Sequence, residues 1–107
     1  MLNEVTFVEA QRGLGELMMK NGSTPEQRIA YGYQRATARV ADADTVKLLA
    51  KGLNERRQWF ATHPEDAQKA ITQGASKPDP KLDPAELAAY TTTAGVLMNL
   101  DRVVTRD

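Results

Sequence analysis

The chain has 107 residues, no cysteine, and 14 basic residues balanced by 14 acidic ones. This length fits one domain, and hydrophobic and charged fractions of 41% and 26% are ordinary for a globular protein. The composition excludes disulfides and thiolate metal sites, and the balanced charge disfavours a nucleic-acid binder, which usually carries a basic excess. No apolar run is long enough for a membrane span, and residues 1–9 lack the pattern of a signal peptide.

Capping residues followed by apolar residues at helical spacing predict five helices. The expected ranges are 6–21, 24–40, 44–62, 64–73 and 83–105, four of them substantial and the fourth one short. The signals for helix starts are Thr6 with Glu9, Thr24-Pro25 with Gln27, the run Asp42–Thr45, His63-Pro64 and Asp83-Pro84. Asn21-Gly22 and Gly74 mark helix ends, because these residue types tolerate a left-handed backbone.

An apolar stripe runs along each expected helix and predicts the core. The stripe residues are Phe7, Ala10, Leu14, Leu17, Met18, Ile29, Tyr33, Ala36, Val40, Val46, Leu49, Leu53, Phe60, Ala67, Ala70, Ile71, Leu87, Tyr90, Ala94, Leu97, Leu100 and Val104. Trp59 is expected at the edge of its stripe, and Gly13 and Gly15 are expected to allow close helix packing. No segment shows a sustained period of two. We therefore predict an all-α fold, a compact bundle of about five helices forming a single domain over residues 1–107.

No residue pattern points to a catalytic centre, a metal or another cofactor. His63, the only histidine, lies near Glu65 and Asp66, an arrangement better explained as a helix junction with an acidic first turn. Ser23 and Ser76 lie in loop or cap contexts rather than in a nucleophile motif. A catalytic carboxylate pair is not expected, because nothing else marks a site around the candidate glutamates, which are Glu9, Glu16, Glu26, Glu55 and Glu86.

A line of arginines and one inward-facing acid form the main polar pattern. Arg28, Arg35 and Arg39 share one helical line, and Arg56-Arg57 adds basic charge on the next helix. A solvated face with one or two internal ion pairs explains this better than a surface for an anionic partner, since basic stretches lack interleaved aromatics. Asp101 falls on the inward face of the last helix, where a carboxylate needs a partner. We predict a structural ion pair between Asp101 and one of the three arginines, with a ligand-binding role for Asp101 as the alternative.

Three segments carry a resemblance that covers nearly the whole chain. They are LNEVTFVEAQRGLGELM (2–18), STPEQRIAYGYQRATAR (23–39) and LDPAELAAYTTTAGVLMNLDRVVTRD (82–107). The most specific parts are Phe7-Val8-Glu9-Ala10, Arg28-Ile29 and Asn99-Leu100-Asp101. In order and spacing they are similar to the C-terminal region of DUF1553 (PSD1), a domain of unknown function found in planctomycete-type cytochrome c proteins.

The resemblance implies that the chain is the C-terminal piece of a large parent protein located in the periplasm or at the cell surface, often with a haem c domain. The chain itself has no Cys-x-x-Cys-His motif and is not expected to attach haem. Its expected partners are upstream domains of the parent, a cytochrome c domain among them.

Three hypotheses for function follow from these observations. The first is a non-catalytic helical accessory or interaction domain of such a parent. The second is a domain that supplies part of an active or ligand site completed by upstream domains, and the third is a free-standing helical regulator. A broad exposed apolar strip would favour the first hypothesis, and a ligand or metal in a polar cleft would favour the second.

Overall fold

The computed structural model describes residues 4–74 and 76–105, with the side chains of residues 7–74 and 76–100. These residues form five α-helices and no strand, which confirms the predicted all-α fold. The helices are α1 (Glu4–Lys20), α2 (Pro25–Thr37), α3 (Ala43–Ala61), α4 (Pro64–Ile71) and α5 (Pro84–Thr105). Their bounds lie within three residues of the predicted ones.

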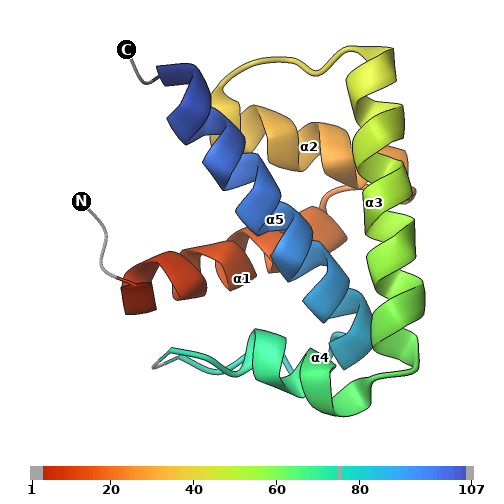
Figure 1. Cartoon of the computed structure of the whole chain (residues 1–107), viewed down its shortest axis with the longest axis vertical. Helices are drawn as coiled ribbons and strands as arrows, with labels where there is room; N and C mark the ends of the chain where they lie inside the picture. Colours follow the sequence, from red (N-terminus) through yellow and green to blue (C-terminus); the bar gives the residue numbers. More distant parts are fainter. Residues whose placement is uncertain (1–3, 75, 106–107) are drawn as a thin grey trace.

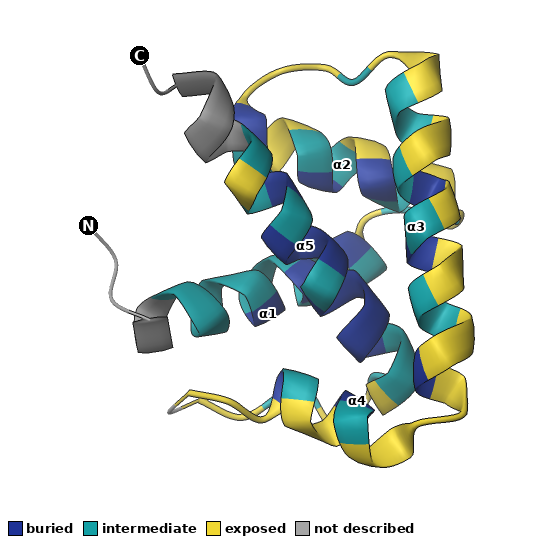
Figure 2. Cartoon of the chain, viewed as in Figure 1, coloured by how far each residue is buried: buried dark blue, intermediate teal, exposed yellow. Residues whose placement is uncertain are grey.

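Helix α5 is the centre of the fold and contacts each of the other four helices. Figure 1 shows α5 running diagonally across the molecule, with α1 and α4 below, α2 above and α3 along one edge. Figure 2 shows α5 dark blue over successive turns, whereas α3 and α4 carry exposed outer sides. The buried residues of α5 are Leu87, Ala88, Ala89, Tyr90, Thr91, Thr93, Ala94, Gly95 and Leu97. Because many of these side chains are small, neighbouring helices can pack on several sides of α5.

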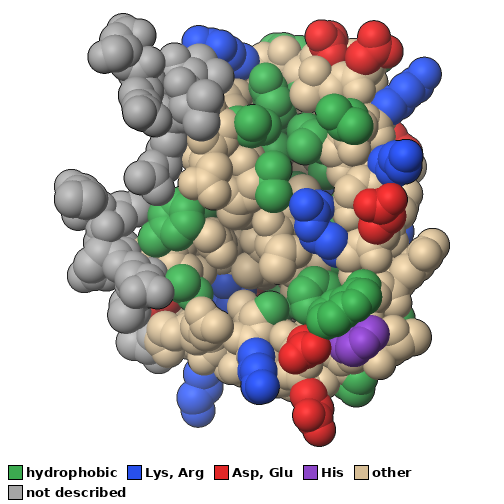
Figure 3. Space-filling view, in the orientation of Figure 1, with side chains coloured by type: hydrophobic (Ala, Val, Ile, Leu, Met, Phe, Trp, Pro, Cys, Tyr) green, Lys and Arg blue, Asp and Glu red, His purple; other side chains and the backbone are tan. Residues whose placement is uncertain are grey.

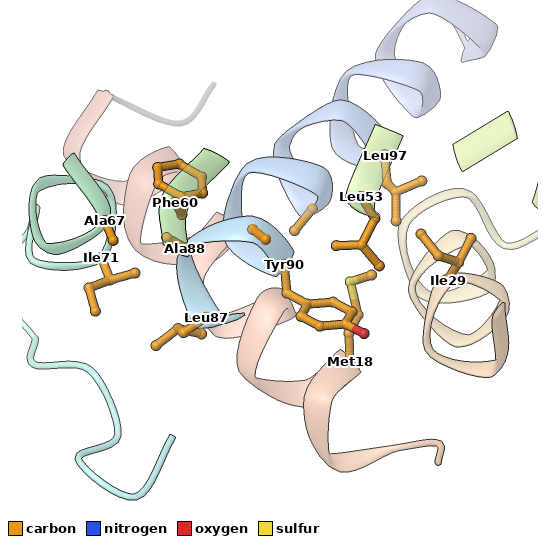
Figure 4. Close-up of a cluster of buried hydrophobic side chains, with 12 residues drawn as sticks. Met18, Ile29, Leu53, Phe60, Ala67, Ile71, Leu87, Ala88, Tyr90 and Leu97 are labelled. Carbon is orange, nitrogen blue, oxygen red and sulfur yellow. The ribbon is translucent and has the colours of Figure 1, made fainter. Parts of the chain in front are cut away.

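The core is assembled around Tyr90, which is fully buried despite its size. Figure 4 shows its ring among Met18 of α1, Ile29 of α2 and Leu53 of α3, with Leu97 about two turns further along α5. A second part of the cluster joins Phe60 of α3 and Ala67 and Ile71 of α4 to Leu87 and Ala88 of α5. Every helix therefore contributes to one continuous core, as a domain of this size requires.

Helices α1 and α5 approach each other closely at Gly15. A β-carbon at Gly15 would lie only 2.9 Å from the backbone nitrogen of Thr91 and 3.0 Å from its α-carbon. This confirms the expected packing role of Gly15, because any side chain would force the two helices apart. The same expectation for Gly13 is wrong, since a β-carbon there would meet nothing within 4 Å.

Three predicted helix starts are confirmed by their capping hydrogen bonds. The Thr24 hydroxyl accepts from the amide of Gln27 at 3.1 Å, and Asp42 accepts from the amide of Thr45 at 2.8 Å. Asp83 likewise accepts from the amide of Glu86 at 3.0 Å. Each bond satisfies one of the amide donors that a helix leaves free in its first turn.

The predicted start of the first helix and the predicted end of the second are wrong. Helix α1 begins at Glu4, so Thr6 lies inside the helix instead of capping it. Helix α2 ends at Thr37 rather than residue 40, because Ala38 takes a left-handed conformation with φ 60° and donates its amide to the carbonyl of Gln34. As a result Val40, predicted to face the core, lies in the following loop and is 83% exposed.

Candidate functional site

Arg28 is a half-buried arginine that links α2 to the centre of the fold. Its Nε donates to the carbonyl of Gly22 at 3.0 Å, and its Nη1 donates to the Tyr90 hydroxyl at 3.3 Å. The guanidinium carbon also lies 5.5 Å from the centre of the Tyr90 ring. Arg28 thus gives the only polar atom of the Tyr90 side chain a partner at the edge of the core.

The other predicted ion-pair residues are spread along the same helix and beyond it. Arg35 is exposed, with its guanidinium carbon 5.9 Å from the centre of the Tyr31 ring. Arg39 is exposed in the loop after α2, and its amide donates to the Thr37 hydroxyl at 3.2 Å. The side chain of Asp101 lies outside the described residues, so the predicted ion pair stays a prediction.

Arg12 on α1 is the most deeply buried charged side chain among the described residues, with 4% of its surface exposed. Its Nη1 donates to the carbonyls of Ile71 at 2.9 Å, Ser76 at 3.0 Å and Gln73 at 3.4 Å. Its Nη2 donates to the Ser76 hydroxyl, and its Nε lies 3.9 Å from a carboxylate oxygen of Glu16. We call this set the Arg12 network. It fixes the segment that follows α4 against α1.

Three more charged residues of α1 bind the same segment. The carboxylate of Glu9 accepts from the amide of Ser76 at 2.8 Å, and that of Glu16 accepts from the amide of Asp79 at 2.9 Å. The ammonium group of Lys20 lies 2.9 Å from the carboxylate of Asp79. Hydrogen bonds from the Lys81 amide and from Lys20 lower the pKa of Asp79, and the bond to Asp79 raises the pKa of Lys20.

Sequence reasoning missed the Arg12 network, although a signal was present. Glu9, Arg12, Glu16 and Lys20 follow each other at intervals of three or four residues, which places them along one side of a helix. A row of alternating charges normally indicates a solvated face. Here the row faces a long loop whose backbone amides and carbonyls need partners, so its role is structural.

The basic pair on α3 is also used inside the fold. The Nε of Arg57 donates to the carboxylate of Glu86 at 2.9 Å, which raises the pKa of the arginine. The Nη1 of Arg56 donates to the buried hydroxyl of Thr93 at 3.2 Å. Both arginines therefore join α3 to α5, Arg57 through an ion pair and Arg56 through a hydrogen bond to a neutral hydroxyl.

Trp59 and His63 form a fixed aromatic pair at the C-terminal end of α3. Their rings stack with centres 3.8 Å apart and planes 6° apart, and the Trp59 ring also meets the edge of Phe60 at 5.3 Å. The His63 Nδ1 donates to the carbonyl of Trp59 at 2.7 Å. Because that carbonyl is a hydrogen-bond acceptor, the contact assigns the Nδ1 proton and holds the imidazole in place. The imidazole therefore covers one face of the Trp59 ring, although 47% of the Trp59 surface is exposed.

A hollow of about 400 Å³ opens beside Trp59, lined by Gly52, Glu55, Arg56, Trp59, Phe60 and Thr92. Figure 3 shows the position on the surface, where hydrophobic side chains lie next to the single histidine. A larger hollow of about 590 Å³ lies between α4 and the segment before α5, with Ile71, Pro78 and Leu82 in its lining. The hollow beside Trp59 offers an aromatic wall, one carboxylate and one guanidinium, which suits packing of an apolar group at a polar rim.

Within the described ranges, no group of three or more metal-binding side chains is arranged to hold an ion. His63 stacks on Trp59 rather than meeting Glu65 or Asp66 in any such group. None of the described helices is long and apolar enough to cross a membrane. Comparison of the chain with protein-family models, with curated proteins and with solved structures finds no match in any of the three.

Proposed function

We propose that this chain is a non-catalytic helical accessory domain that docks other protein surfaces through the outer side of α3. In this proposal the five helices form a rigid support. The docking side carries Leu48, Trp59 and the hollow beside Trp59. The chain supplies no reacting group of its own, and its charged side chains serve mainly to hold its helices and loops together.

The observation that carries the proposal is the distribution of large exposed hydrophobic side chains. Leu48 is 72% exposed and Trp59 is 47% exposed, and both belong to α3. Val40, the third such residue, lies in the loop that leads into α3. Apolar side chains gathered on one element are typical of a surface that another protein covers, whereas single exposed hydrophobics scattered over a molecule need no explanation.

The sequence resemblance suggests where such a domain would work. It points to a large parent protein of the periplasm or cell surface that often carries a haem c domain. The proposed partner is therefore an upstream domain of the same parent, with the cytochrome c domain as the most informative candidate to test. The charged side chains of α1 bind the segment after α4, and the arginines of α3 bind α5. This internal use supports an accessory role over an active site.

Hydroxyl-radical footprinting with mass spectrometry tests the proposal. The labelling rates of Leu48 and Trp59 are measured in the isolated chain and in the longer protein that contains it. We expect both rates to fall at least severalfold in the longer protein, because a docked surface excludes water. Tyr90 is the internal control, since it is buried in the core and should label slowly in both samples. Equal rates for Leu48 and Trp59 in both samples would contradict the proposal.

A further inference from the structure

Four residues of α3 form a continuous stripe on its outer side, and we call them the outer stripe. They are Leu48, Gly52, Glu55 and Trp59. Their intervals of four, three and four residues place them on one face, since eleven residues complete just over three helical turns. The same intervals define the seam along which two helices pack in a coiled coil.

The hollow beside Trp59 has the form of a site for a side chain from a facing helix. Five of its lining residues belong to α3, and four of these lie at positions i, i+3, i+4 and i+7: Gly52, Glu55, Arg56 and Trp59. Phe60 of α3 and Thr92 of α5 complete the lining. In helix packing, four residues with this spacing form the hole that receives one side chain of the facing helix. Gly52 has no side chain to close the hollow, and the atom nearest to the place of its missing β-carbon is Nη1 of Arg56, at 3.1 Å. Trp59 forms the wall on the other side.

The outer stripe also carries the side chain that fits this hole. Leu48 lies one turn before Gly52 and is the more exposed of the two large hydrophobic residues on α3. If two α3 helices pack in antiparallel directions about a twofold axis, each Leu48 meets the hollow of the other helix. A parallel pair would instead place Leu48 against its own copy, away from both hollows. The stripe is therefore complementary to itself in the antiparallel arrangement alone.

The charges along one edge of the outer stripe agree with this arrangement. Lys51 and Glu55 lie on the same flank of α3, are exposed, and form no ion pair with any residue that the structure describes. A twofold axis through the middle of the stripe preserves the flank, so Lys51 of each copy comes within reach of Glu55 of the other. The flank then holds two ammonium groups and two carboxylates with no net charge, which favours pairing of two copies.

We propose that the partner of the outer stripe is a second copy of this chain, in a symmetric antiparallel α3–α3 dimer. This inference rests on the proposed docking role of α3, and it concerns the chain whose outer stripe is not covered by an upstream domain. A single helix pair buries less than the roughly 1,200 Å² of a stable interface, so the dimer should be weak and reversible. We expect a dissociation constant on the order of 100 µM.

Sedimentation velocity between about 10 µM and 1 mM tests the dimer. The average mass of the unmodified chain should rise toward that of a dimer, and the Leu48→Glu variant should stay monomeric. Because Leu48 is exposed, its replacement leaves the monomer folded, which circular dichroism checks. The emission of Trp59, the only tryptophan, should shift to shorter wavelength with concentration in the unmodified chain and not in the variant.

Charge reversal tests the predicted register. Lys51→Glu and Glu55→Lys should each weaken the dimer about fivefold, and the double variant should regain the affinity of the unmodified chain within about twofold. Lys47→Glu, an exposed charge beyond the stripe, is the matched control and should have little effect. Failure of the double variant to regain affinity would overturn the register and with it the dimer.

A monomer at every concentration, assembly beyond a dimer, or an equally strong dimer of Leu48→Glu would each overturn the inference. These outcomes leave the proposed docking role intact if footprinting still finds Leu48 and Trp59 covered in the longer protein. The opposite result is also possible to recognise. A dimer that forms with rising concentration supports the inference. If Leu48 and Trp59 also label equally in the dilute isolated chain and in the dilute longer protein, that result counts against docking within one parent chain.

Discussion

Replacement of Arg12 by alanine should destabilise the domain more than replacement of any exposed arginine. The guanidinium of Arg12 donates to the buried carbonyl of Ile71, so the loss of that bond leaves an acceptor without water or protein partner. An unsatisfied buried acceptor costs about 1–3 kcal/mol. The carbonyls of Gln73 and Ser76 are partly exposed, and water can replace the arginine there at about 0.5 kcal/mol each.

The aliphatic part of the Arg12 side chain adds to this effect. It is removed from water between α1 and the segment after α4, and its truncation should cost about 1 kcal/mol. The total loss in the free energy of unfolding is therefore about 3–5 kcal/mol, a large part of the stability of a typical domain. The melting temperature should fall by about 15–25 °C. Arg12→Met keeps an aliphatic side chain and should lose about 1 kcal/mol less.

Urea denaturation followed by circular dichroism measures these losses. Arg35→Ala is the matched control, because Arg35 is an exposed arginine on a neighbouring helix and its loss should cost below about 0.5 kcal/mol. Trypsin should also cut after Lys81, in the segment between α4 and α5, faster in Arg12→Ala than in the control. A loss below about 1 kcal/mol for Arg12→Ala would refute the reasoning, since it would mean that the buried carbonyl finds another partner.

Three further predictions follow from single residues. Gly15→Ala should destabilise the fold by about 1–3 kcal/mol because it collides with α5, whereas Gly13→Ala should stabilise it by about 0.5–1 kcal/mol through helix propensity alone. Thr91→Val should change stability little or raise it by up to about 1 kcal/mol, because the buried Thr91 hydroxyl has no hydrogen-bond partner among the described residues. Thr93→Val should instead lower stability by about 1 kcal/mol, because it removes the acceptor of the Arg56 hydrogen bond. Because the pKa of Asp79 is lowered in the folded chain, its carboxylate contributes stability that is fully present above its ordinary pKa of 3.8 and is lost as the pH falls below that value. Asp79→Asn should therefore reduce the dependence of unfolding on acid.

Urea titrations of each pair at neutral pH check the first two predictions, and titrations between pH 2 and 7 check the third. Equal effects of alanine at Gly13 and Gly15 would contradict the close α1–α5 crossing. A loss at Thr91 as large as that at Thr93 would mean that the Thr91 hydroxyl is satisfied. An unchanged acid dependence in Asp79→Asn would mean that its carboxylate titrates alike in the folded and unfolded chain.

The sequence by itself determined the number of helices and most of their boundaries. Pro25, Pro64 and Pro84 each open a helix, and Thr24, Asp42 and Asp83 cap the helices that follow them. These signals are local, because a cap needs only the amides of the next turn. The end of α2 was not predicted because Ala38 takes a left-handed backbone conformation, which glycine favours and alanine does not.

Only the tertiary structure decided which helix lies at the centre and which charged residues are internal. The stripe of α5 indicates one buried face, yet its small residues let the other helices approach from several sides. From the sequence, Arg12 is expected at the surface. It is internal because carbonyl groups more than fifty residues away, at the end of α4 and in the segment after it, accept its hydrogen bonds. The stack of Trp59 on His63 likewise covers one face of the Trp59 ring and leaves the residue half exposed, which helical periodicity does not encode. Periodicity reports the preferences of one helix, whereas burial depends on which other segments supply partners and surface to cover it.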